Sequence, residues 1–138
     1  MQLSSKSDVD TSRQVEDLIE RACKLAITTS PREQAEFVVD AIGARMVTAA
    51  VGLRDARAVR AWARGGDIKE AAAQQRLQEL FQVVWAISER YSPAVAAAFV
   101  RGTNPYLGDR APLVVLADEP PEKGGPAILA AARHLLED

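Results

Sequence analysis

The chain has 138 residues, with 17 Lys and Arg against 19 Asp and Glu and a formal net charge of -2, a length that suffices for one ordinary domain with its own core. Its single cysteine, Cys23, excludes an internal disulfide framework and a CxxC metal knuckle. No window approaches the roughly 20 apolar residues of a membrane span, so we expect a cytoplasmic protein with no membrane partner.

The composition favours helix almost throughout the chain. Alanine is abundant, aromatic residues make up 5%, and the strict Val/Ile/Thr alternation typical of strands is missing. We therefore predict an all-α fold, a compact helical bundle that contains a helix-turn-helix-like unit. In chain order we expect an N-terminal arm and helix at 1–29, the helix-turn-helix-like region at 30–66 and a C-terminal helical region at 67–138.

The first two helices are predicted from apolar spacing and capping residues. Residues 1–10 are polar and are expected to form a loose arm, because they offer little apolar surface to offset the entropy of ordering. Thr11 or Ser12 can cap a helix that ends near residues 28–29 and whose apolar positions are Val15, Leu18, Ile19, Ala22 and Leu25. Next, Ser30 is the predicted N-cap, Pro31 the first helical position and Glu33 the second half of a capping box. This second helix carries the apolar stripe Ala35, Val38, Val39 and Ile42.

A helix, a glycine-bearing turn and a second helix follow at residues 44–64. Gly52 closes the short apolar segment 44–51, and Asp55 can cap a helix over 56–64 that ends at Gly65 and Gly66. This is the sequence form of a helix-turn-helix. The charge is concentrated here, because only Asp55 opposes the five arginines Arg45, Arg54, Arg57, Arg60 and Arg64.

The helix at 56–64 divides into a basic and an apolar face. At about 100° per residue, Arg57, Arg60 and Arg64 share one side, while Val59 and Trp62 point to the other and are expected in the core. Such a helix can present guanidinium groups to phosphates or to base edges in a major groove. The alternative is that the arginines only solvate a surface helix or pair with acids such as Asp55. We predict DNA contacts at Arg54, Arg57, Arg60 and Arg64.

The second half of the chain is read as four helices and two turns. The longest pattern follows residue 67 and has its apolar face at Ala73, Leu77, Leu80, Phe81, Val84, Ile87 and Tyr91. Ser92 and Pro93 then open a helix that ends at Gly102. After a turn-rich corner at residues 103–113, we expect a short helix at 113–117, a turn from 120 to 125, and a terminal helix with Ile128, Leu129, Ala132, Leu135 and Leu136 on its apolar face.

Catalytic motifs are missing from the sequence. The one histidine, His134, lies beside Arg133 and Glu137 with no serine or cysteine motif that would make it a general base. There is no HExxH, no glycine-rich phosphate loop and no GxSxG elbow. We therefore expect no enzymatic activity, no metal and no cofactor, and we interpret His134 as a solvated side chain and Cys23 as a small buried apolar residue.

The corner carries a family resemblance. Asn104, Pro105, Leu107, Gly108, Arg110 and Pro112, followed by Leu113 and Leu116, resemble the Asn-Pro-x-Leu-Gly-x-Arg-x-Pro signature of the MbcA/ParS/Xre type of bacterial antitoxin. The run Ala44, Arg45, Val47, Val51, Gly52, Val59, Trp62 and Gly65 resembles the helix-turn-helix half of the same family. Two positions depart from the pattern: Phe99-Val100 stands where Trp-Leu is usual, and Pro120-Pro121 interrupts the region after Leu116.

The resemblance implies an antitoxin that binds a RES-domain toxin, an enzyme that destroys NAD, and that represses its own operon by binding promoter DNA. It places toxin contacts in the C-terminal region, at Asn104, Tyr106, Leu107, Arg110, His134 and Leu136, in a homo-oligomer or hetero-oligomer. Each of these residues could instead shape the corner or fill the core. The rival functions are a plain helix-turn-helix regulator without a toxin, and an interaction module whose helix-turn-helix has lost DNA binding.

Overall fold

The computed structural model describes residues 2–138, and it confirms the all-α prediction. Eight α-helices and one short 3₁₀ helix, η1, occur in this part of the chain. Their bounds are α1 Gln2–Thr28, α2 Pro31–Ile42, α3 Ala44–Ala50, α4 Ala56–Ala63, α5 Ala71–Arg90, α6 Pro93–Arg101, η1 Pro105–Leu107, α7 Pro112–Asp118 and α8 Pro121–Glu137.

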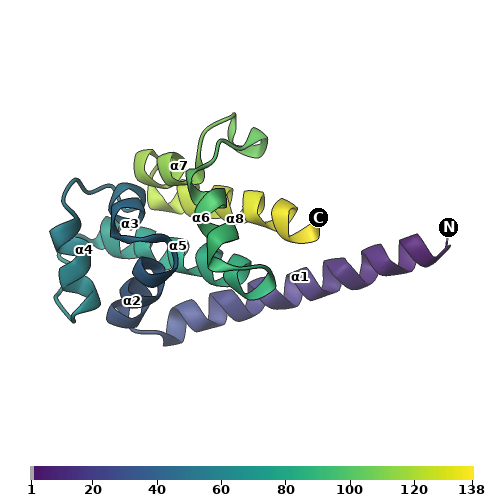
Figure 1. The fold of residues 1–138 in the computed structure, drawn as a ribbon, viewed down its shortest axis with the longest axis horizontal. Helices are drawn as coiled ribbons and strands as arrows, with labels where there is room; N and C mark the ends of the chain where they lie inside the picture. Colours follow the sequence, from purple (N-terminus) through teal and green to yellow (C-terminus); the bar gives the residue numbers. More distant parts are fainter. Residues whose placement is uncertain (1) are drawn as a thin grey trace.

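Helix α5 is the central element of the bundle (Figure 1). It packs against α1, α2, α6 and α8. Helices α2, α3 and α4 pack on one another and form a three-helix unit at one end of the molecule. Helices α7 and α8 pack against each other. Helix α1 runs along one side, and its N-terminal part extends past the other helices. The three regions predicted along the chain therefore share one hydrophobic core.

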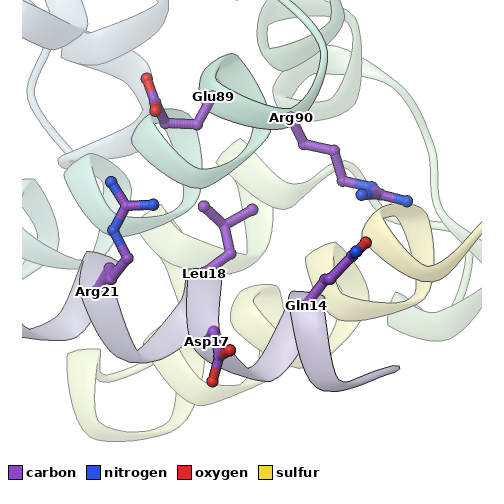
Figure 2. A pocket seen from close by; sticks show the side chains of 6 residues that line it. All are labelled: Gln14, Asp17, Leu18, Arg21, Glu89 and Arg90. Atoms are coloured by element: carbon purple, nitrogen blue, oxygen red, sulfur yellow. The ribbon is translucent and has the colours of Figure 1, made fainter. Parts of the chain in front are cut away.

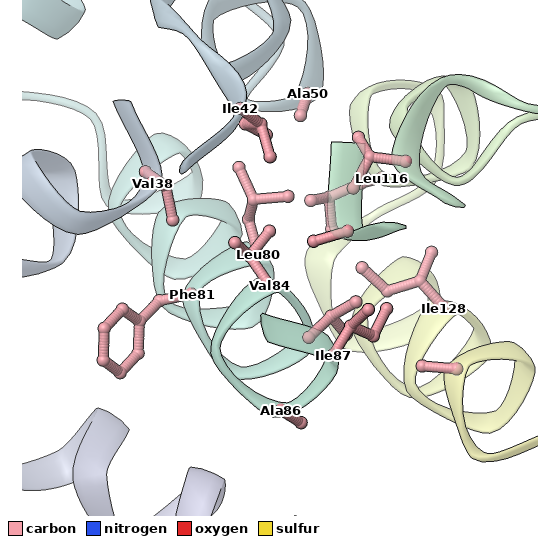
Figure 3. Close-up of a cluster of buried hydrophobic side chains, with 14 of the residues drawn as sticks. Val38, Ile42, Ala50, Leu80, Phe81, Val84, Ala86, Ile87, Leu116 and Ile128 are labelled. Carbon is pink, nitrogen blue, oxygen red and sulfur yellow. The ribbon is translucent and has the colours of Figure 1, made fainter. Parts of the chain in front are cut away.

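The core forms where α5 meets α2, α7 and α8 (Figure 3). The expected apolar face of α5 is buried, with Leu77, Val84 and Ile87 fully inaccessible to solvent. Tyr91 was expected on the same face, and this prediction is wrong, since its side chain is 41% exposed. Helix α5 ends at Arg90, so Tyr91 no longer follows the helical spacing, and its hydroxyl donates to the carbonyl of Leu135 at 3.1 Å.

The N-terminal helix is longer than expected. We predicted a loose arm over residues 1–10 and a helix capped by Thr11 or Ser12, but α1 begins at Gln2 and has 27 residues against 20 for α5. Residue 1 lies outside the described residues. No proline or glycine interrupts residues 2–28, so nothing in the local sequence forces a start at residue 11.

The junction of α1 and α2 follows the predicted capping chemistry. Ser30 is the N-cap, and its hydroxyl accepts from the Glu33 amide at 3.2 Å. The Glu33 carboxylate accepts from the same hydroxyl at 3.1 Å, in place of the Ser30 backbone amide of a complete capping box. Buried Gln34 turns back and donates to the carbonyls of Ala26 at 2.9 Å and Thr29 at 3.1 Å, which satisfies open carbonyls at the end of α1.

The start of α8 corrects a third prediction. A turn was expected from residue 120 to 125, but α8 begins at Pro121 and contains Gly124, Gly125 and Pro126. Both glycines are buried. A Cβ on Gly124 would stand 3.1 Å from the Val115 carbonyl of α7, and one on Gly125 would overlap the Glu79 carboxylate of α5. The glycines are therefore helical because α8 passes close to its neighbours, and this packing outweighs their poor helix propensity.

Glu79 provides a pH-dependent test of this packing. Burial raises the pKa of its carboxyl above the usual value, because desolvation disfavours the ionised form. The folded state then binds the proton more tightly than the unfolded state. The contribution of Glu79 to stability is therefore fully present below the unfolded pKa and is lost as the pH rises through the folded pKa.

We expect Glu79→Gln to raise the Tm at about pH 7 and to lose this gain toward about pH 3, where both states of the wild type are protonated. Thermal melts at the two pH values measure the effect, with Glu89→Gln, exposed on the same helix, as the control. An equal increase in Tm at both pH values would contradict the idea that burying the ionised Glu79 carboxylate destabilises the fold.

Candidate functional site

The two short helices and the glycine turn predicted at residues 44–64 are present. Gly52 has a φ of +81°, and its amide donates to the Ala49 carbonyl at 3.2 Å while the Leu53 amide donates to Thr48 at 3.0 Å. This pair of bonds is a Schellman motif, which ends α3 and redirects the chain. Asp55 then caps α4 as predicted, accepting from the Arg57 amide. Helix α2 packs against both α3 and α4.

The two faces of α4 are divided as expected. Val59 is fully buried and Trp62 is 4% exposed, and both belong to the hydrophobic core. Arg57, Arg60 and Arg64, which we call the arginine face, are exposed. Arg54, just before the N-cap, is exposed as well. The four predicted DNA contacts thus lie on α4 or next to it, and the opposite face of this helix is buried in the core.

Arg57 differs from the other three arginines. Its Nε and Nη2 donate to Oδ2 of Asp55 at 2.8 Å and 2.6 Å. This bond lowers the pKa of the Asp55 carboxyl, with a further contribution from the Arg57 backbone amide, and raises the pKa of the guanidinium. Within residues 9–138, no ion pair involves Arg54, Arg60 or Arg64.

Sequence reasoning counted the charge of Arg45 but did not select it as a contact. In the structure Arg45 and Arg54 flank a hollow of about 170 Å³ between α3 and α4. Its remaining lining residues are Thr48, Ala49, Leu53 and Ala56. Arg45 lies on the exposed side of α3, so it could have been included among the predicted DNA contacts.

The corner is built around Asn104. Its amide donates to the Arg110 carbonyl at 3.1 Å, and its carbonyl accepts from Leu107 at 3.0 Å and Asp109 at 2.9 Å. Its side-chain Oδ1 caps η1 by accepting from the Tyr106 amide at 2.9 Å. Asn104 therefore shapes the corner, one of the two roles considered for it.

The structure brings Tyr106 of the corner and His134 of α8 together. Their rings stack with centroids 3.7 Å apart and planes 2° from parallel, and both side chains are exposed, Tyr106 to 62%. We call them the stacked pair. Sequence reasoning selected both residues but not their contact, because it depends on how α8 packs against η1.

The other residues selected as toxin contacts separate into surface and core. Arg110 is exposed, donates to the Leu107 carbonyl at 3.3 Å and has its Nη1 4.0 Å from the Glu119 carboxylate. Leu107 is 6% exposed and Leu136 is fully buried. These two leucines support the surface from the core and do not present side chains on it.

The hollow drawn in Figure 2 has no catalytic residue set. It measures about 440 Å³ and lies between α1 and the end of α5. Its lining residues are Gln14, Asp17, Leu18, Arg21, Glu89 and Arg90, which carry charges of both signs. In the described part of the chain, no group of three or more His, Cys, Asp or Glu side chains is placed to hold a metal ion, and none of the helices there is long and apolar enough to cross a membrane.

Cys23 is partly buried rather than fully buried. Its Sγ lies 3.4 Å from Oε1 of Gln82. Burial, followed by the charges of Glu79 and Glu20, raises the pKa of the thiol. A raised thiol pKa lowers the thiolate fraction at neutral pH, so Cys23 has the environment of an unreactive cysteine.

Comparisons of the chain with models of protein families, with curated proteins and with solved structures find no match in any of the three sets.

Proposed function

We propose that this protein is a cytoplasmic DNA-binding antitoxin. In this proposal, the arginine face binds promoter DNA of its own operon, and the surface around the stacked pair binds and neutralises a toxin. The observation that carries the proposal is the placement of these two surfaces on different parts of the molecule. Helix α4 lies at one end, and the green corner lies well away from it (Figure 1). One chain can then engage DNA and a protein partner at the same time.

The DNA-binding half of the proposal rests on α4 and its surroundings. A helix anchored by Val59 and Trp62 and lined with exposed arginines matches the form of a recognition helix, whose outer face enters the major groove. Arginines supply the phosphate attraction that dominates affinity for DNA and the bidentate donors that read bases.

The toxin-binding half rests on the corner. Tyr106 is exposed, yet the Asn104 cap and the stack on His134 hold it in place. Val114 of α7, which follows the corner in the chain, is 37% exposed and is a further apolar side chain on the surface. Tyrosine and arginine are enriched among residues that dominate protein–protein binding energy, and Arg110 belongs to the same corner. The resemblance of this tract to the MbcA/ParS/Xre antitoxins makes a RES-domain, NAD-degrading enzyme the proposed partner, in a homo-oligomer or hetero-oligomer.

A plain transcriptional regulator is the second candidate. The observation that favours it is that all four predicted DNA contacts lie within the three-helix unit or directly beside its helices, and none lies in the corner. DNA binding would then need no toxin, and the C-terminal helices would serve only to complete the core.

Co-expression with the neighbouring gene product separates these functions. We expect the wild type and the Arg57→Ala/Arg60→Ala/Arg64→Ala variant to restore growth, while Tyr106→Ala/His134→Ala fails to do so, because truncating a central aromatic residue costs about 2 kcal/mol or more of binding energy. Both changes are at exposed side chains, so circular dichroism should show folded proteins. If no neighbouring product is toxic or binds, the antitoxin proposal is wrong and the plain regulator takes its place.

A further inference from the structure

The bond between Asp55 and Arg57 uses one defined edge of the guanidinium. A guanidinium has a side edge, formed by Nε and one terminal nitrogen, and an end edge, formed by the two terminal nitrogens. Asp55 Oδ2 accepts from Nε and Nη2 of Arg57, and therefore occupies the side edge. Asp55 Oδ1 accepts from the Arg57 backbone amide at 2.9 Å. One carboxylate thus caps α4 and orients the first arginine of the helix.

The end edge of Arg57 stays open for a ligand. It presents two roughly parallel N–H donors, from Nη1 and from the second hydrogen of Nη2. In the major groove, guanine offers two adjacent acceptors, N7 and O6, whereas adenine pairs an acceptor with a donor. A donor pair in a fixed orientation therefore matches guanine and leaves an unfavourable contact with adenine.

Arg57 also occupies the part of α4 that reaches bases. It is the second residue after the N-cap, and the N-terminal residues of a recognition helix are those that contact base edges. Its side chain is 88% exposed, so the ion pair points into solvent where DNA would dock. Arg60 and Arg64 follow along the helix, and within residues 9–138 neither has an ion-pair partner. Their guanidinium groups can contact phosphates, which arginine side chains commonly do in protein–DNA complexes.

The charge of Asp55 supports a role in selectivity. It is the one acid among the residues from 45 to 66, which carry five arginines. A carboxylate beside DNA weakens binding to every sequence, because phosphates repel it. An exposed ion pair also adds little stability, about 0.2 to 1 kcal/mol. The ion pair does restrict the rotamers of Arg57, so the side chain loses less conformational entropy when it binds. This restriction favours the base that matches the fixed orientation over other bases.

We propose that Asp55 and Arg57 form a guanine-reading unit, in which Arg57 donates end-on to N7 and O6 of one guanine in the major groove and Asp55 is the positioning residue. This inference rests on the proposed DNA binding and names the base that the site recognises.

Binding-site selection from a randomised duplex pool tests the unit. Wild type should select a guanine at one position, and Arg57→Ala should lose roughly 5- to 150-fold discrimination at that base pair. Asp55→Asn should reduce discrimination at the same base pair while non-specific affinity stays equal or rises. Asparagine preserves the N-cap but removes the charge that holds the guanidinium. Asp55→Ser is a second capping variant that is too short to reach the guanidinium.

Arg60→Ala is the matched control. It should weaken binding to all sequences alike and reduce the slope of log affinity against log salt by about one unit. The inference is overturned if wild type selects a site and Arg57→Ala keeps every base preference. It is also overturned if both Asp55 variants, folded by circular dichroism, keep full discrimination. Failure of the wild type to bind any duplex at low salt would instead overturn the proposed DNA binding itself.

Discussion

Trp62→Ala should lower the free energy of unfolding by about 3 to 5 kcal/mol, the usual cost of truncating a buried tryptophan. Trp62 is 4% exposed and belongs to the hydrophobic core. It lies on α4, which packs against α2 and α3. A cavity at this position removes the contacts that hold α4 on the bundle, so the proposed DNA binding should be lost together with stability.

Denaturant melts measure this effect, and Trp85→Ala is the control. Trp85 is only partly buried, with the Arg21 guanidinium 5.3 Å from its ring centroid, so we expect a smaller loss. A Trp62→Ala protein with unchanged stability and lost DNA binding would place Trp62 in the interface and contradict the assignment of the helix faces.

Replacing Arg57, Arg60 and Arg64 together by alanine should abolish specific binding to the upstream region of the operon and leave the fold intact. All three side chains are exposed, so the substitution removes charge without creating a cavity. Each lost phosphate contact lowers the salt slope by about 0.9. With Arg60 and Arg64 on phosphates and Arg57 on a base, the slope should fall by about two units.

A salt titration by fluorescence anisotropy provides the measurement. The control carries the same change in net charge at exposed positions outside the three-helix unit, Arg13→Ala, Lys24→Ala and Arg101→Ala. If this control loses binding as strongly as the arginine-face variant, the effect comes from overall charge, and α4 is not the DNA-binding element.

Local chemistry in the sequence was sufficient to predict most helix ends and the buried and exposed faces of α4. Ser30, Asp55 and Ser92 are caps in the structure as predicted, because a side-chain oxygen that satisfies a backbone amide acts within three residues. The turn at Gly52 was equally readable, since a positive φ favours glycine. The buried and exposed sides of α4 follow from helical spacing alone.

Tertiary packing determined the contacts between segments that are distant in the sequence. Gly124 and Gly125 have the sequence of a turn but are helical, because α8 needs their small size to approach α5 and α7. The stack of Tyr106 on His134 and the burial of Leu107 and Leu136 depend on the same docking of α8. A local pattern specifies the backbone conformation that a residue prefers and the helix face on which it lies. The contacts between helix faces exist only once the helices have packed, and close packing there can outweigh local preference.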